Sequence, residues 1–285
     1  LDDNLISAKI LLGTTYMDMG DYDEAMEIYT TALKQAEELG DKAGMGASLN
    51  GIGAVHYYKS DYDKALDYYG RSLAIREELG DKRGMGLTLG NIGIVHENKG
   101  EYDKALEYYD RSLVINEELG DKAGMGGSLN NIGGVHSNKG DLDKALDYYG
   151  RSLAIREELG DKRGMGDSLI NIGNVHHNKG EYDTALDYYG RSLAIQEELG
   201  DKYGMGYSLN NIGIVHANKG DYSKALDYHG RSLSIREEIG DKAGMGLTLS
   251  SIGVVHANKG DYDKAAEHLE KSLSILKEIG LKGLE

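Results

Sequence analysis

The sequence predicts an all-α fold, a right-handed α-α superhelical solenoid of seven helical hairpins. The first observation is a 40-residue repeat, since near-identical blocks that open with Asp-Lys-x-Gly-Met-Gly begin at Asp41, Asp81, Asp121, Asp161, Asp201 and Asp241. A looser copy fills residues 1–40. The second observation is that apolar side chains recur at helical spacing, while no segment alternates as a strand would. A fixed period of this size is typical of a solenoid, in which each unit buries its apolar face against its neighbours.

The period also decides the expected domain organisation. A chain of 285 residues would suggest two domains by its length alone. Because every block needs its neighbours to cover its apolar face, we instead expect one elongated array over residues 1–285. The repeats are expected at about 1–40, 41–80, 81–120, 121–160, 161–200, 201–240 and 241–280.

The first half of each block predicts a helix, which residues 81–120 illustrate. Apolar or semi-apolar side chains form one helical stripe, with Val95 beside it. The stripe consists of Met85, Leu89, Ile92 and His96. Gly100 is expected to end this helix because glycine accepts the left-handed conformation. Lys59, Lys99 and Lys139 fall at the ends of such helices, where a cation is favoured.

The second half of the block predicts a second helix, which begins near Glu101 and ends before Gly120. Its apolar side chains have the spacing i, i+3, i+4, i+7 and i+11. They are Tyr102, Ala105, Leu106, Tyr109 and Leu113. Acidic residues at the start of this helix, such as Asp61 and Asp63, are expected to cap free N–H groups, and Asp121 is placed to cap the next helix. Each block is therefore an antiparallel helical hairpin.

Small residues recur at one phase of both helices, as Gly93 and Ala105 do in this block. Glycine inside a helix costs about 1 kcal/mol relative to alanine, so its recurrence indicates close contact between the two helices. The whole chain resembles the tetratricopeptide repeat (TPR) superfamily through Leu89, Ile92, Gly93, His96, Tyr102, Ala105 and Tyr109. The longer repeat is similar to those of Pins/LGN spindle-orientation adaptors and of kinesin light chains. It departs from the family pattern in having histidine where tyrosine is commoner and no helix-ending proline.

Several motifs suggest chemistry that their context argues against. Six of the nine histidines occur once per repeat, about 10 Å apart by helix spacing, whereas zinc needs several ligands at about 2 Å. We expect packed, hydrogen-bonded histidines and no metal. Gly84-Met85-Gly86 lacks the Gly-Lys-Ser/Thr of a phosphate loop, so no nucleotide or other cofactor is expected. No repeat breaks the pattern with clustered polar side chains, which predicts a protein without catalytic activity.

Composition bounds the partners and the compartment. A net charge of −16 argues against nucleic acid, which requires clustered Lys and Arg. The tyrosine pairs, such as Tyr68-Tyr69, are therefore expected in the core and not stacked on bases. No apolar run approaches the roughly 20 residues of a membrane span. Cysteine is absent, which is consistent with a reducing compartment, and we expect a cytoplasmic protein.

The TPR resemblance implies that the first helices of the repeats line a concave groove. Columns on their second stripe vary from copy to copy, for instance at positions 87, 94 and 97. We interpret this variation as ligand selectivity, with drift of a solvated surface as the alternative. The selectivity candidates are Ile94, Asp167, Asn174, His177 and Tyr207.

Two asparagine ladders lie on the same stripe. One comprises Asn91, Asn131, Asn171 and Asn211; the other comprises Asn98, Asn138, Asn178, Asn218 and Asn258. An amide carries both donors and an acceptor, so it can bond the backbone of an extended peptide. The resemblance implies this use of asparagine. Bonding to neighbouring helices is the alternative for the first ladder, and capping of the helix end is the interpretation that we favour for the second.

The sequence thus predicts a non-catalytic scaffold that binds an extended peptide segment of a partner. No arginine stands in the column of Leu87, and with the acidic balance this favours a neutral or basic partner. The last helix carries Leu269, Leu273, Leu276 and Ile279, an apolar face that predicts either an array cut from a longer protein or an end that joins another chain, as in a homo-oligomer. The alternatives are a self-assembling or designed, consensus-like array without an evolved ligand, and a regulatory segment of a larger protein.

Overall fold

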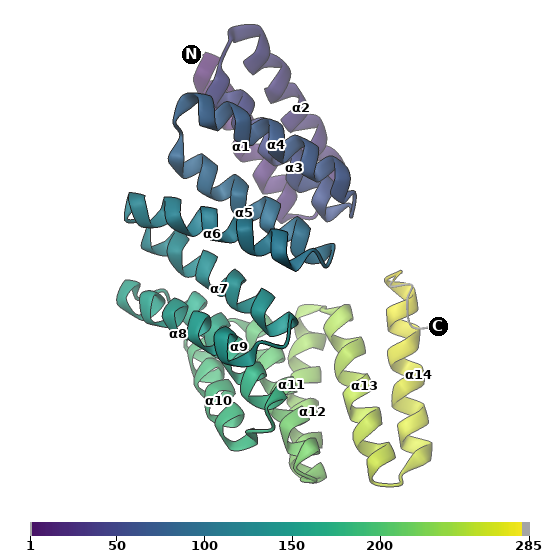
Figure 1. Ribbon diagram of the computed structural model, residues 1–285. Coiled ribbons are helices and arrows are strands. Elements are labelled where there is room, and N and C mark those ends of the chain that lie inside the picture. Colours follow the sequence, from purple (N-terminus) through teal and green to yellow (C-terminus); the bar gives the residue numbers. More distant parts are fainter. Residues whose placement is uncertain (1, 281–285) are drawn as a thin grey trace. The chain divides into compact units, whose positions relative to one another are not determined.

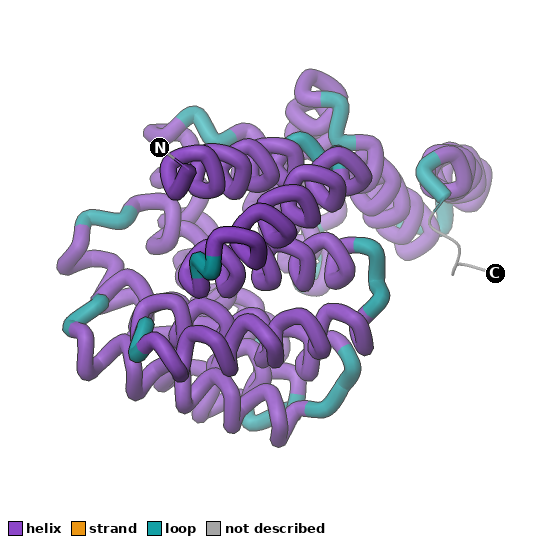
Figure 2. Tube along the Cα trace, turned by 90° about the horizontal axis from the view of Figure 1, so that it is seen from above, coloured by secondary structure: helices purple, strands orange, loops and turns teal. Residues whose placement is uncertain are grey.

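The computed structural model describes residues 2–280, with side chains from residue 5. This part of the chain consists of fourteen α-helices joined by short turns and contains no strand (Figures 1 and 2), which confirms the predicted all-α fold of seven hairpins. The first helices of the repeats are α1 (Asp2–Asp18), α3 (Lys42–Tyr58), α5 (Lys82–Asn98), α7 (Lys122–Asn138), α9 (Lys162–Asn178), α11 (Lys202–Asn218) and α13 (Lys242–Asn258). The second helices are α2 (Tyr22–Leu39), α4 (Tyr62–Leu79), α6 (Tyr102–Leu119), α8 (Leu142–Leu159), α10 (Tyr182–Leu199), α12 (Tyr222–Ile239) and α14 (Tyr262–Glu278).

The helices form two compact units, Leu1–Lys144 and Ala145–Glu285. Consecutive helices pack against one another from α1 to α7 in the first unit and from α9 to α14 in the second. Successive odd-numbered helices also contact one another, in the series α1–α3–α5–α7 and α9–α11–α13. The even-numbered pairs α2–α4, α4–α6, α10–α12 and α12–α14 make no such contact between the described residues. The odd-numbered helices are therefore the more closely spaced row, so within each unit they lie on the inner side of the curve. The single array of seven repeats stays a prediction.

The hairpins are held closed where a tyrosine ring covers a glycine. A Cβ atom added to Gly93 would lie 2.5 Å from Cε1 of Tyr109, so only glycine lets this ring pack against α5. Tyr109 and Ala105 are both fully buried. The same contact joins Gly53 to Tyr69 in α4. The close helix contact expected from the recurring small residues is confirmed.

The starts of the two kinds of helix are stabilised differently. Asp81 caps α5, because its carboxylate accepts a hydrogen bond of 2.9 Å from the backbone N–H of Gly84. The equivalent aspartate caps α3, α7, α9, α11 and α13 in the same way, as predicted for Asp121. At the start of α4, however, Asp61 makes no side-chain cap bond. The capping predicted for Asp61 is wrong, since its carboxylate instead pairs with Lys64 at 2.7 Å and lies 3.5 Å from His56.

Ion pairs with a 40-residue period join neighbouring helices. Lys99 lies at the end of α5, as predicted, and its Nζ is 2.7 Å from the carboxylate of Asp63 in the preceding repeat. Asp63 thus contacts a lysine as well as occupying the first turn of α4. Lys82 at the start of α5 pairs with Glu118 of its own repeat at 2.7 Å. These pairs are exposed, so each one is weak, but they repeat along the stack.

The recurring histidines pack inside the hairpins. His96 is buried, stacks on the Tyr108 ring with 5.3 Å between centroids, and holds Nδ1 2.8 Å from Glu101. This arrangement confirms the predicted packing and hydrogen bond for His96, whereas Nδ1 of His216 is buried without a hydrogen-bond partner among the described residues. It also explains Tyr108, which covers His96 while its neighbour Tyr109 covers glycine. Across the described residues, no group of three His, Cys, Asp or Glu side chains could hold a metal ion.

The last helix leaves part of its predicted apolar face uncovered. Leu269 and Leu273 on α14 are 40% and 39% exposed. Leu276 is buried, and a Cβ atom at Gly246 of α13 would lie 2.7 Å from its Cδ2. The prediction that Leu276 belongs to the uncovered face is wrong, because it fills the contact between α13 and α14. Residues 281–285 lie outside the described part.

Candidate functional site

The candidate site is the solvent-facing side of the odd-numbered helices, which we call the inner face. In the first unit it includes Asn91, Ile94 and Asn98 of α5, with Asn131 and Asn138 of α7. Asn91, Ile94 and Asn131 are half-buried, and the other two asparagines are exposed. In the second unit it includes, by the same positions, Asp167, Asn171, Asn174, His177, Asn178, Tyr207, Asn211 and Asn218. The predicted residues therefore lie on one kind of helix face in each unit.

The first asparagine ladder makes bonds between successive inner helices. Nδ2 of Asn91 donates to Oδ1 of Asn50 in α3 at 3.2 Å. Nδ2 of Asn211 donates to Oδ1 of Asn174 in α9 at 3.4 Å. Each bond uses one of the two N–H donors that an amide carries. The ladder therefore joins neighbouring helices and still presents donor and acceptor capacity at a half-buried surface.

The second ladder bonds a side chain of the preceding repeat. Nδ2 of Asn98 donates to the Tyr57 hydroxyl at 3.2 Å and also to the carbonyl of Ile94, in the last turn of α5, at 2.9 Å. Asn218 in the second unit lies 2.8 Å from Nε2 of His177. Bonding within the last turn fits the predicted helix-end role. The sequence did not predict this bond to the preceding repeat. The partners Tyr57, Glu97 and His177 share one variable column, and each lies 41 residues before the asparagine that it contacts.

Glu97 is the centre of a small hydrogen-bond network in the first unit. Its carboxylate accepts from the Tyr109 hydroxyl at 2.9 Å and from Nδ2 of Asn138 at 3.1 Å. Burial raises the pKa of Glu97, and the two hydrogen bonds only partly oppose that shift. Glu97 thus connects the ring that closes its own hairpin to the asparagine of the next one.

The selectivity candidates of the second unit have mixed surroundings. Asn174 accepts a bond of 2.7 Å from the Tyr189 hydroxyl as well as the bond from Asn211. Asp167 is exposed, and one of its oxygens lies 3.8 Å from Nη1 of Arg156. The surrounding protein raises the pKa of Asp167, and Arg156 opposes this effect. Asn174 therefore has a structural role besides its place on the inner face.

Tyr207 is accompanied by two residues that the sequence patterns did not single out. Its ring centroid lies 5.3 Å from that of Tyr203, one turn earlier in α11. On its other side, Cζ of Arg236 lies 4.7 Å from the Tyr207 ring. Arg236 is only 2% exposed and donates to Oδ2 of Asp241 at 2.8 Å. The signal in the sequence is that α11 alone has aromatic residues at both of these helix positions.

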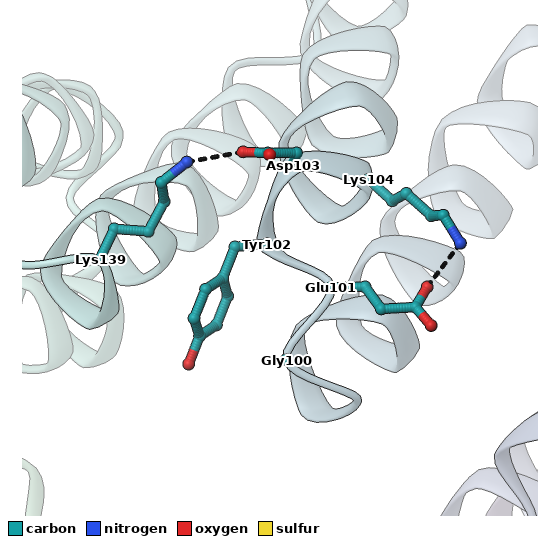
Figure 3. A pocket seen from close by; sticks show the side chains of 6 residues that line it. All are labelled: Gly100, Glu101, Tyr102, Asp103, Lys104 and Lys139. Carbon is teal, nitrogen blue, oxygen red and sulfur yellow. Dashed lines mark hydrogen bonds and ion pairs between the residues drawn. The ribbon is translucent and has the colours of Figure 1, made fainter.

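A surface hollow lies at the turn between α5 and α6 (Figure 3). It is lined by Gly100, Glu101, Tyr102, Asp103, Lys104 and Lys139. Its four charged side chains are paired, Lys139 with Asp103 at 2.6 Å and Lys104 with Glu101 at 2.8 Å (Figure 3). Because these charges satisfy one another, the hollow belongs to the ion pairs that join neighbouring repeats.

Comparison with protein-family models identifies the architecture. The tetratricopeptide repeat model matches residues 5–78, 84–158, 124–198, 164–238 and 204–278. The chain belongs to the tetratricopeptide repeat family. A comparison with curated proteins finds no match to this sequence.

Solved structures with the same fold are similar in shape but distant in sequence. The apo form of RapI is 18% identical with a TM-score of 0.76, covering 98% of this chain and 99% of that one. A Rap protein complexed with competence and sporulation factor is 18% identical with a TM-score of 0.73, covering 96% and 76%. A putative kinesin light chain from Podosopora anserina with nearly identical TPR-like repeats is 13% identical with a TM-score of 0.56, covering 67% and 94%. These similarities show the fold.

No helix within residues 2–280 is both long enough and apolar enough to cross a membrane.

Proposed function

We propose that this protein is a non-catalytic scaffold whose inner face binds an extended segment of a partner protein. The observation that carries the proposal is the pair of amide side chains at one helix position in each unit, on α5 and α7 in the first and on α9 and α11 in the second. Amide groups spaced by one helix diameter can bond the N–H and C=O groups of an extended chain without regard to its side chains. Asn91 and Asn211 have further donor and acceptor capacity beyond their bonds to the neighbouring helix. The fold shared with a Rap protein solved in complex with competence and sporulation factor supports the same proposal.

A ladder variant tests this proposal without removing the fold. Serine occupies the ladder position naturally at Ser251, so the substitution Asn→Ser at positions 91, 131, 171 and 211 introduces a side chain that the repeat tolerates. The full chain and this variant are compared in pull-down experiments with identified partner peptides, and their thermal unfolding is followed by circular dichroism. We expect the variant to melt within a few degrees of the wild type and to lose most of its binding.

A matched control changes exposed polar residues on the opposite helices. The variant with Asp67→Ser, Glu107→Ser and Asp187→Ser alters α4, α6 and α10 and leaves the inner face unchanged. We expect it to bind as the wild type does. If this control lost binding while the ladder variant kept it, the binding surface would lie on the even-numbered helices. That result would contradict the proposal.

A second proposal, self-association, is favoured by the exposed side chains of α14. Tyr262 is 73% exposed, and Leu269 and Leu273 of the same helix are 40% and 39% exposed. Apolar patches of this kind mark interfaces. Light scattering of the full chain is expected to show dimers or larger species that dissociate in the Leu269→Lys, Leu273→Lys variant. A strictly monomeric wild type at high concentration would contradict this second proposal.

A further inference from the structure

The sixth repeat departs from the others at the inner face. Tyr203 and Tyr207 occupy positions that hold Ala, Arg, Gly, Asp or Leu in the repeats from 41–80 to 241–280. Both rings face solvent, with exposed fractions of 55% and 39%. An aromatic pair exposed at one place in an otherwise uniform array has no evident part in stacking the repeats.

A buried arginine packs against the Tyr207 ring and fixes its position. Arg236 is buried beneath it, and its guanidinium lies 4.7 Å from the ring centroid. The guanidinium cannot turn towards solvent, because Nη1 donates to Asp241 and Nε donates to Ser232 at 3.3 Å. This packing fixes the ring while Tyr207 stays 39% exposed to a ligand. A tyrosine fixed in advance loses little side-chain entropy on binding, which is why such residues contribute most of the affinity at many interfaces.

The surroundings of the tyrosine pair are apolar on the side of α13, whereas Arg236 and Asp241 lie beside the pair and the exposed Asp167 occupies the position of Tyr207 on α9. Leu247 and Val254 on α13 are 53% and 51% exposed and continue the same face. Apart from their histidines, α11 and α13 each contain one charged residue, Lys202 and Lys242, and both lysines pair with glutamates of α12 and α14. A hydrogen bond with Tyr207, together with burial, raises the pKa of Tyr203 to about 12, so its hydroxyl stays neutral at physiological pH.

The acidity of the chain therefore lies elsewhere. The second helices carry most of the acidic side chains, as α10 shows with Asp183, Asp187, Glu197 and Glu198. A partner segment on the inner face of α11 and α13 would meet no unpaired lysine there, and the nearest acidic side chain of the inner face is the exposed Asp167 of α9. The net charge of the whole chain predicted a neutral or basic partner. Because most acidic side chains lie on the second helices, we narrow this expectation to an uncharged partner segment at α11 and α13.

We propose that Tyr203, Tyr207, Leu247 and Val254 form an anchor patch for an aromatic or aliphatic side chain of an uncharged extended segment. The anchor patch lies on the same face as the asparagine ladder and continues it from Asn211. The ladder bonds the segment's backbone, and the patch selects one side chain by apolar contact and by the Tyr207 ring. This inference rests on the proposed function, because it names the ligand class of the same face.

The test uses the full chain and a positional library of nonapeptides whose ends are acetylated and amidated. The wild type is expected to select an aromatic or aliphatic residue at one position and to disfavour Asp and Glu there. The double variant Tyr203→Ala, Tyr207→Ala introduces the residues found at the same positions of α3, so the helix is preserved. It is expected to bind the selected peptide at least 10-fold more weakly. The matched control Val114→Ala removes an exposed apolar side chain from α6 and introduces the alanine found at this position in other repeats, so it is expected to leave binding unchanged.

The outcomes separate this inference from the function on which it rests. Peptides that bind the wild type but not the ladder variant would support the proposed function. If such peptides carried a charged residue at the selected position, or bound the double tyrosine variant equally well, the anchor patch alone would be overturned. A library in which no peptide binds the wild type would overturn the proposed function, and the anchor patch with it.

Discussion

Lowering the pH from 7 to 4.5 is expected to destabilise the sixth repeat through one histidine. His229 on α12 is fully buried where Tyr109 and Tyr189 stand in other repeats, and its ring packs against Gly213. Its Nδ1 lies 3.0 Å from Oδ1 of Asn210, while Nε2 is buried without a partner. A protonated ring would place a charge in this apolar position. Burial therefore lowers the pKa of His229 to about 4.

The size of the effect follows from proton linkage. The ordinary pKa of histidine is about 6.5, so between pH 6.5 and 4 the unfolded chain binds a proton that the folded chain does not. The stability contribution is complete above pH 6.5 and is lost as the pH falls towards 4. A shift from about 6.5 to about 4 corresponds to roughly 3 kcal/mol in total, and to about 2.5 kcal/mol by pH 4.5.

The assay compares urea unfolding at pH 7 and pH 4.5 in the wild type and in the variant His229→Tyr, which restores the usual residue. His268→Tyr is the matched control, since most repeats also have tyrosine at that position, yet His268 lies at the surface of α14. We expect His229→Tyr to remove about 2 kcal/mol of the acid-induced loss, whereas His268→Tyr removes little. Equal losses in the wild type and in His229→Tyr would refute the burial argument.

Three further predictions concern packing and buried charge. Gly93→Ala is expected to cost about 1–3 kcal/mol, because the new Cβ atom would meet Tyr109. Gly70→Ala, in open space on α4, is expected to stabilise by up to about 1 kcal/mol, and thermal melting of both variants checks the pair. The wild type is expected to lose stability as the pH rises from the ordinary carboxyl pKa to the raised pKa of Glu97 in the folded protein. Glu97→Gln is expected to remove this loss, and urea unfolding across that pH range measures it. Arg236→Ala is expected to cost about 3–5 kcal/mol, because it removes a buried arginine and takes its ion-pair partner from the half-buried Asp241. Arg236→Gln, the side chain of the preceding repeat, should cost clearly less in the same unfolding assay, and equal costs would contradict the role of the ion pair.

The helices and their contacts could be predicted because their causes are local and repeated. Gly93 and Tyr109 are 16 residues apart within one hairpin, and six copies of the pattern average out the drift at other positions. The capping by Asp81 follows from its place three residues before Gly84. The error at Asp61 has a physical reason, since a half-buried carboxylate beside a lysine and a histidine has better partners than the helix N–H groups.

The candidate site could be predicted only in part. The columns that contain Asn91 and Asn98 were found by their recurrence, but their partners 41 residues away depend on how neighbouring repeats are set against one another. The role of Tyr207 was suggested by variation. The buried Arg236 beneath it was not, because an arginine at that position looks like an exposed residue of an amphipathic helix.

The sequence by itself determined the period, the hairpin, the family and the face on which the variable residues lie, because each of these depends on spacing along one chain. Only the tertiary structure decided which polar side chains bond a neighbouring repeat, as Glu97 and Asn138 do, and which remain exposed to a ligand. It also decided where the acidic charge lies. Net charge is a sum over the chain, whereas a partner meets one surface, and the folding of α11 and α13 separates that surface from the carboxylates of the second helices.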